Sequence, residues 1–251
     1  MIQLKSAREI ETMAAGGRIL AATHQHIKPA LVPGATTLDI DKMVERFIRS
    51  HAGATPSFKG LYGFPASACI SLNEEIVHGI PSAKRVLKDG DIVTVDIGVY
   101  YGGFHTDSAW TYAVGNISDE AKRLMQVTEA SLWAAIDQCV LGNHIGDLGA
   151  ACEAVVTKAG YTVVRDLVGH GVGAVMHEDP QVPNHGKPKR GPRLQAGMTL
   201  AIEPMVNVGA AATKTLSDKW TIVTLDGELS AHFEHTVAIT AEGPRVLTTL
   251  G

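Results

Sequence analysis

The chain has 251 residues, of which 45% are hydrophobic, and a formal net charge of −4 at pH 7. This length and apolar content fit one large domain with a substantial core, and we expect a single domain spanning residues 1–251. The negative charge argues against a broad nucleic-acid surface, so sequence-specific nucleic-acid binding is not expected. Residues 1–9 show no apolar signal-like segment, no run of about 18 apolar residues occurs, and the three cysteines have unpaired spacings. We therefore predict a cytoplasmic protein without membrane association.

The first part of the chain shows two helical patterns. We predict helices from Ser6 to about Ile27 and from Thr37 to about Ala52, the second ended by Gly53. The apolar residues of the second helix recur with the spacing of one helical face: Ile40, Met43, Val44, Phe47 and Ile48. Strands are then predicted from about residue 68 to residue 110.

Two aspartates lie within these strand-like residues. Residues 93–100 alternate between apolar side chains and a face that carries Asp96. A two-residue loop centred on Tyr101-Gly102 would pair Asp96 directly with Asp107, so that both carboxylates point the same way. Like charges so placed repel unless a cation lies between them, which indicates a divalent metal ion. The alternative is a solvated hairpin whose aspartates are ordinary turn residues.

The second half of the chain repeats this order of elements. Ser118 is predicted to cap a helix whose apolar residues extend to Val140, and another helix ends at Gly160 before strands follow again. Several residues recur at similar intervals: Gly34 with Gly142, Gly53 with Gly160, Asp96 with Glu203, and His78 with His177. The repeat predicts two αβ halves that face each other across a pseudo-twofold axis.

The second half supplies two more carboxylates and a histidine. Glu203 and Glu234 each lie in an apolar, strand-like run, over residues 199–204 and 231–237, and His170 lies between two glycines. Four carboxylates and one imidazole form an oxygen-rich set that suits two divalent ions better than one structural zinc. His232 and His235 flank Glu234, and we expect strand alternation to turn both away from the face that Glu234 uses.

Three other patterns have competing interpretations. Gly169-x-Gly171 fits a loose dinucleotide-binding fingerprint, but prolines interrupt the helix that should follow it. His177-Glu178 does not continue as a zincin helix, because the matching second histidine is absent and Pro180 would break the turn. The basic stretch at residues 187–193 is interpreted as a solvated loop, with a contact to ribosomal RNA as the alternative.

The order of these motifs resembles the methionine aminopeptidases of the creatinase/aminopeptidase superfamily, in their short bacterial form. The resemblance rests on Asp96 and Asp107, on His170 in G-H-G-V-G, on Glu203 in I-E-P-M, on Glu234 in F-E-H-T, and on the segments N-E-E-I-V-H-G-I-P (73–81) and H-E-D-P-Q-V (177–182). It covers nearly the whole chain. It implies an α+β pita-bread fold of two pseudo-twofold-related halves around a dinuclear metal site, with residues 1–251 forming one catalytic domain.

The resemblance also implies roles for the site residues. Asp96 would bind the first metal only, Asp107 and Glu234 would bridge both ions, and His170 and Glu203 would complete the second. Glu203 is then the candidate proton shuttle. His177 would donate to the developing oxyanion, and His78 would bind the substrate backbone. The metals implied are cobalt, manganese, iron or zinc.

The implied activity is removal of the initiator methionine from nascent polypeptides whose second residue is small and uncharged. An apolar pocket would hold the methionine side chain. Its expected lining is Phe58, Leu61, Phe64, Cys69, Met176 and Trp220, together with His78 and His177. We expect a monomer with transient ribosome contact. The alternatives are a peptidase acting on X-Pro bonds and a non-catalytic binding homologue, which would have lost metal ligands.

Overall fold

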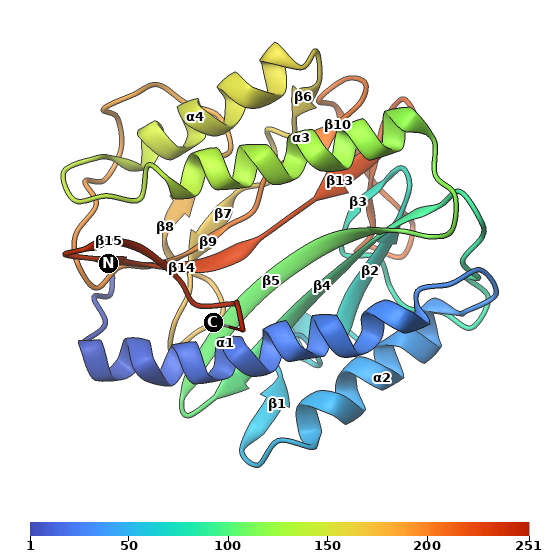
Figure 1. The fold of residues 1–251 in the computed structure, drawn as a ribbon, viewed down its shortest axis with the longest axis horizontal. Helices are drawn as coiled ribbons and strands as arrows, with labels where there is room; N and C mark the ends of the chain where they lie inside the picture. Colours follow the sequence, from blue (N-terminus) through green and yellow to red (C-terminus); the bar gives the residue numbers. More distant parts are fainter. Residues whose placement is uncertain (251) are drawn as a thin grey trace.

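The computed structural model describes residues 1–250 and has two halves of similar construction (Figure 1). The first half comprises α1 (Ala7–Ile27), the 3₁₀ helix η1 (Lys28–Ala30), α2 (Thr37–Arg49), β1 (Ala54–Pro56), the 3₁₀ helix η2 (Leu61–Gly63), β2 (Ala68–Leu72), β3 (Glu75–Val77), β4 (Ile92–Tyr101) and β5 (Phe104–Ala113). The second half begins with α3 (Asp119–Ile136) and α4 (Ile145–Lys158). Its strands are β6 (Thr162–Val163), β7 (Gly169–Gly171), β8 (Glu178–Val182), β9 (Thr199–Ile202), β10 (Met205–Asn207), β11 (Thr213–Thr215), β12 (Ile222–Thr224), β13 (Ser230–His232), β14 (His235–Thr240) and β15 (Gly243–Val246).

The helix starts follow from local sequence, whereas two helix ends differ from the prediction. Ser6 caps α1 in a reciprocal pair with Glu9, and the helix spans the residues predicted for it. Helix α2 ends at Arg49, ahead of the expected Ala52, and α3 ends at Ile136. Val140 therefore lies outside α3, where its side chain is exposed. Within residues 1–250, no helix is long and apolar enough to cross a membrane.

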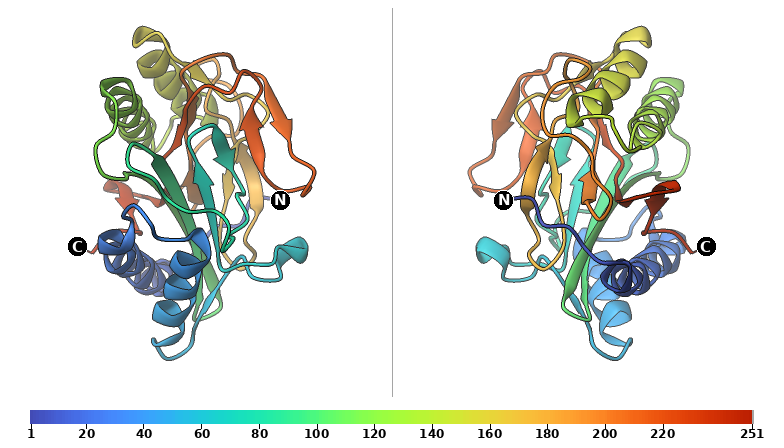
Figure 2. Two further views of the ribbon diagram at one scale, coloured as in Figure 1. Left: turned by 90° about the vertical axis from the view of Figure 1, so that its right-hand side faces the viewer. Right: turned by 90° about the vertical axis from the view of Figure 1, so that its left-hand side faces the viewer.

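Two main sheets carry the chain's core. Strand β4 lies between β1 and β2 and also pairs with β5, while the second sheet has the order β15-β14-β9-β7-β8. The apolar face of β4, including Val95 and Ile97, packs with Leu20 of α1 and Val44 of α2. Helices α3 and α4 pack in the same way on the strands of the second half. Figure 2 shows α1 and α3 on the same side of the strands, which leaves the other side for the site.

The register of the β4–β5 hairpin corrects the sequence prediction. Tyr101 pairs with Phe104, so the loop is Gly102-Gly103 and not Tyr101-Gly102, and Asp107 lies opposite Gly98. Both loop glycines have positive φ angles, of 59° and 94°, which tight hairpin turns require and which a tyrosine resists. Asp96 and Asp107 are consequently diagonal neighbours on one face. This still brings their carboxylates together.

Matching backbone turns support the predicted internal repeat. Gly34 and Gly142 have φ angles of 94° and 95°, and Gly53 and Gly160 have φ angles of 81° and 84°. Each pair lies at corresponding positions before or after the second helix of its half. Such left-handed turns favour glycine, so both halves use the same residue type at the same two corners.

Candidate metal centre and active site

The five proposed metal ligands come from different strands of the two halves. Asp96 lies in β4 and Asp107 in β5, whereas His170 is the middle residue of β7. Glu203 follows the last residue of β9, and Glu234 lies between β13 and β14. The Glu234 amide donates to the carbonyl of Ala109 at 2.8 Å, and the Asp107 amide donates to Thr236 Oγ1, also at 2.8 Å. These bonds join the halves where their carboxylates meet.

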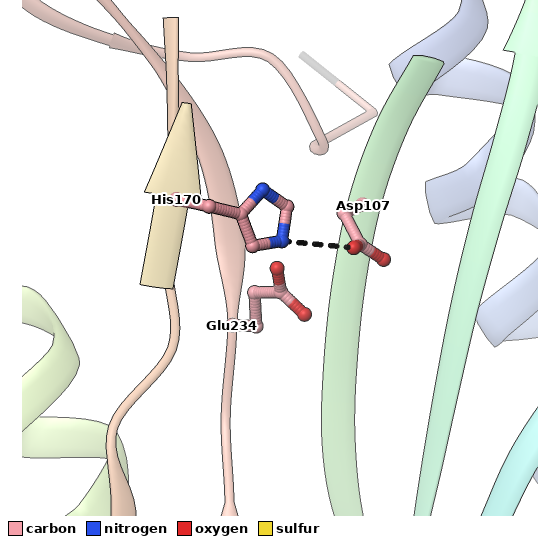
Figure 3. Close-up of side chains that lie close together, drawn as sticks. All are labelled: Asp107, His170 and Glu234. Carbon is pink, nitrogen blue, oxygen red and sulfur yellow. Dashed lines mark ion pairs between the residues drawn. The ribbon is translucent and has the colours of Figure 1, made fainter. Parts of the chain in front are cut away.

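The side chains of Asp107, His170 and Glu234 converge on one point (Figure 3). One ligand atom from each lies within 4.8 Å of the others. His170 Nε2 is 3.8 Å from Asp107 Oδ2 and 3.6 Å from Glu203 Oε1. His170 Nδ1 lies 2.8 Å from the carbonyl oxygen of Gly171, which only accepts, so Nδ1 carries the hydrogen. Nε2 therefore presents a lone pair to the carboxylates.

Burial leaves several oxygen atoms of these acids without partners. Asp96 Oδ1, Asp107 Oδ1 and Glu234 Oε1 are buried and have no hydrogen-bond partner. Within residues 1–250, the ion pairs of Asp107 and Glu203 are with histidines and never with lysine or arginine. Buried polar atoms normally have partners, so unpartnered oxygens on three neighbouring carboxylates call for a cation. The donor set of carboxylate oxygens and one imidazole fits a divalent metal ion.

Burial shifts the pKa values of the four acids and of His170. Burial raises the pKa of Asp96 to about 7. Burial, and then repulsion by Glu234 and Asp96, raises the pKa of Asp107 well above its usual range. The pKa values of Glu203 and Glu234 are raised for the same reasons. Burial lowers the pKa of His170 to about 4, so its imidazole is neutral at pH 7 and available as a ligand.

A cavity of about 320 Å³ opens onto these carboxylates. Five of the six predicted pocket residues line it: Phe58, Leu61, Phe64, Cys69 and Trp220. Met176 is buried in the same apolar cluster, behind the lining. Phe64 packs edge-on against Trp220, with ring centroids 5.1 Å apart. Five further residues that no sequence pattern predicted also line the cavity: Tyr62, Val77, Leu167, Val168 and Met205. They belong to a 3₁₀ helix, a loop and two short strands that only the fold brings together here.

His78 and His177 both line this cavity as well. Burial, with a smaller contribution from His177, lowers the pKa of His78 to about 4, and burial also lowers the pKa of His177. The His177 ring packs edge-on against His170 with centroids 4.4 Å apart, and its Nδ1 lies 3.4 Å from the Tyr62 hydroxyl. Both histidines are therefore neutral hydrogen-bonding groups beside the carboxylates.

His232 contradicts the prediction that it faces away from the site. Its Nε2 lies 3.6 Å from Glu203 Oε2, and neither ring nitrogen has a hydrogen-bond partner. The spacing His232-x-Glu234 could have indicated this, because side chains two residues apart lie on the same face of a strand. His235 does turn away, with Nδ1 bonded to Thr248 Oγ1 at 2.7 Å.

Comparison with known proteins gives consistent matches over the whole chain. A sequence model of metallopeptidase family M24 matches residues 11–241. The methionine aminopeptidase of Clostridium perfringens is 53% identical over 250 residues, covering 100% of both chains. Methionine aminopeptidase 1 of Bacillus subtilis is 52% identical over 248 residues, covering 99% of each.

Solved structures agree with these relatives. The crystal structure of the methionine aminopeptidase from Thermotoga maritima has a TM-score of 0.97 at 43% identity, covering 99% of this chain and 100% of that one. A prolidase from Pyrococcus furiosus has a TM-score of 0.80 at 21% identity, and the match covers 98% of this chain and 65% of the prolidase. At this identity, the likeness shows the fold alone. The predicted pita-bread fold is confirmed. The chain therefore belongs to metallopeptidase family M24 and, within it, to the methionine aminopeptidases.

Proposed function

We propose that this chain hydrolyses the first peptide bond of nascent polypeptides that begin with methionine, when their second residue is small and uncharged. One observation carries the proposal: an apolar cavity ends at a cluster of buried carboxylates whose oxygens have no partners. The cavity suits an unbranched thioether, and the cluster suits a metal-assisted hydrolysis.

The metal site would hold two divalent cations. Asp96 would bind one ion, Asp107 and Glu234 would each contact both, and His170 and Glu203 would bind the other. When bound, the ions lower the pKa of a water molecule and polarise the peptide carbonyl. Manganese, iron, cobalt and zinc all accept this donor set, and availability selects among them. Support for two ions comes from the four carboxylates that line the cavity, whose combined charge when ionised exceeds what one divalent ion balances.

The protein's own groups would then carry the proton transfers. The methionine side chain packs against Phe64 and Trp220, while His78 hydrogen-bonds the substrate backbone. Glu203 accepts a proton as the water oxygen attacks the carbonyl carbon, and His177 donates a hydrogen bond to the oxygen that gains charge. Breakage of the carbon–nitrogen bond releases the amine, which takes the proton from Glu203. The products are free methionine and the shortened polypeptide.

The second residue of the substrate would lie near the metals and His78. Its side chain would share the cavity with His78 and the proposed ligands Asp107 and Glu234, which limits the room for it. Small residues such as alanine, glycine or serine should therefore be accepted and bulky residues excluded.

Further expectations concern the protein's context. We expect one catalytic domain acting as a monomer in the cytoplasm. The basic residues at 187–193 are exposed, so a transient ribosome contact would use this loop. Cosedimentation with ribosomes at low and high salt would test it, since a charge-driven contact weakens as salt rises.

The deciding experiment measures free methionine released from Met-Ala-Ser by the purified protein. Release should be abolished by a chelator and restored by Mn²⁺, Fe²⁺ or Co²⁺. Gly-Pro peptides test the X-Pro alternative, and Met-Leu and Met-Lys peptides test the second-residue rule. Preferred cleavage of Gly-Pro, or equal cleavage of Met-Leu and Met-Ala peptides, would overturn the substrate assignment.

A further inference from the structure

A buried ion pair links the start of the chain to the wall of the cavity. Lys5 Nζ pairs with the Glu178 carboxylate, and each side chain is only 5% exposed. Among residues 1–250, Lys5 is the only buried lysine or arginine. Removing both charges from water is costly, so the pair persists only where its geometry is well held. Lys5 is not among the proposed metal ligands, and it does not line the cavity.

Glu178 begins β8 and directly follows the β7–β8 loop, residues 172–177, which carries Met176 and His177. The loop folds back on this carboxylate: the Val175 amide donates to Glu178 Oε1 at 3.4 Å, and the Gly173 amide donates to the Val175 carbonyl at 3.1 Å. A Cβ atom on Gly173 would lie 2.4 Å from Lys5 Cε and 2.6 Å from Glu178 Oε1. The ion pair therefore packs directly on the loop backbone.

Lys5 itself is held from its own side. Its amide donates to the Gly197 carbonyl at 2.7 Å, its ammonium also donates to the Gln3 carbonyl at 3.2 Å, and Ser6 then caps α1. Figure 2 shows the N-terminal segment running past the second-half strands before it enters α1. One end of the pair is thus anchored to the helical layer and the other to the loop that carries His177.

We infer that Lys5 is a positioning residue, whose ion pair with Glu178 holds the β7–β8 loop so that His177 faces His170 and the cavity. This inference rests on the proposed role of His177. Apart from its packing on His170, the His177 ring contacts Tyr62, whose side chain is mostly exposed and whose hydroxyl is 3.4 Å away. Without Lys5, the Glu178 carboxylate must reach water or take up a proton, and either change alters the contacts that hold the loop. A displacement of about 1 Å at a reacting group costs about 10²-fold in rate.

Lys5→Met tests this directly, since it keeps the apolar stem and removes the charge. Hydrogen exchange of the amides in residues 172–177 should become at least about tenfold faster, because the loop opens more often. The value of kcat for Met-Ala-Ser should fall by about 10–10²-fold, while KM and metal content stay within about twofold. The matched control is Arg245→Met, which breaks the exposed pair between Arg245 and Glu11 of α1, away from the loop. Arg245→Met should change neither the exchange rate of the loop amides nor kcat.

A double-mutant cycle separates positioning from general destabilisation. In a His177→Ala background, Lys5→Met should lower kcat by less than about twofold, because the group that it positions is gone. Equal losses in both backgrounds, or unchanged loop exchange in Lys5→Met, would overturn the inference. If His177→Ala leaves kcat unchanged, the proposed oxyanion role fails, and the exchange comparison alone decides the role of Lys5.

Glu178→Gln provides a second variant should Lys5→Met fail to fold. The amide keeps the shape and accepts a hydrogen bond from Lys5, so the loop should exchange faster than in the wild type by a smaller factor. Exchange equal to that of the wild type in Glu178→Gln would contradict the role of the ion pair. Exchange can be measured without added metal, so this result does not depend on turnover.

Discussion

Nε2 of His232 lies 3.6 Å from Oε2 of Glu203, although His232 ends β13 and Glu203 follows β9, a strand of a different sheet. The His232 backbone is tied to β5, because its amide donates to Thr111 Oγ1 at 3.0 Å and its carbonyl accepts from the same hydroxyl at 2.8 Å. With the ring buried and without other partners, its remaining contact is the carboxylate that we propose as the proton shuttle. His232 is therefore suited to orient Glu203.

His232→Ala should lower metal affinity or kcat by about 10–100-fold, the usual effect of removing a group that orients a metal-ligating side chain. His232→Gln, which keeps a hydrogen-bond donor near the same place, should recover part of the loss. Calorimetric titration of Mn²⁺ and steady-state kinetics measure the two quantities. Identical losses in both variants would argue against a hydrogen-bonding role for His232.

Asp107→Asn should remove the metal centre and not merely slow turnover. The carboxylate is proposed to give one oxygen to each ion, and an amide supplies less charge to both. Metal counting on the purified variant should show the loss. Retention of two tightly bound ions together with near-normal turnover would show that Asp107 does not bridge.

His177→Ala should lower kcat by roughly 10²–10³-fold, the scale for removing one oxyanion donor. Metal content should stay unchanged, because His177 is not among the proposed ligands. Kinetics on Met-Ala-Ser and metal counting on the same preparation check both statements. Loss of metal from this variant would instead make His177 a ligand.

His24 of α1 should contribute to acid sensitivity. Its Nδ1 bonds the Tyr112 hydroxyl at 2.9 Å, its Nε2 lies 3.1 Å from the Ser108 carbonyl, and burial lowers its pKa to about 4. Between this value and the unfolded value near 6.5, the unfolded state binds the extra proton, so stability falls as pH falls.

His24→Gln should therefore flatten the dependence of the free energy of unfolding on pH in this window, by up to about 1.4 kcal/mol per pH unit. Urea unfolding at several pH values between 4 and 7 measures the slope. His26→Gln, at an exposed position on the same helix, is the matched control. A slope unchanged by His24→Gln would mean that this histidine is not buried neutral.

Local sequence determined much of the fold and most of the candidate site. Ser6 with Glu9 marks the start of α1, and the alternation of Val93, Val95 and Ile97 marks the buried face of β4, because capping and strand periodicity depend on near neighbours only. The family resemblance supplied the candidate ligands and pocket residues. The structure brings these residues to one cavity or to the cluster behind it.

Only the tertiary structure decided how these elements meet. The hairpin register depended on which two residues take positive φ angles, and the pattern of apolar residues fits either loop. The contact of His232 with Glu203 and the pair of Lys5 with Glu178 join residues far apart in the chain. Such contacts arise when whole layers of structure pack together, so the spacing of residues along the chain does not predict them. Burial then decides their chemistry, because it turns ordinary acids and histidines into groups that require a partner.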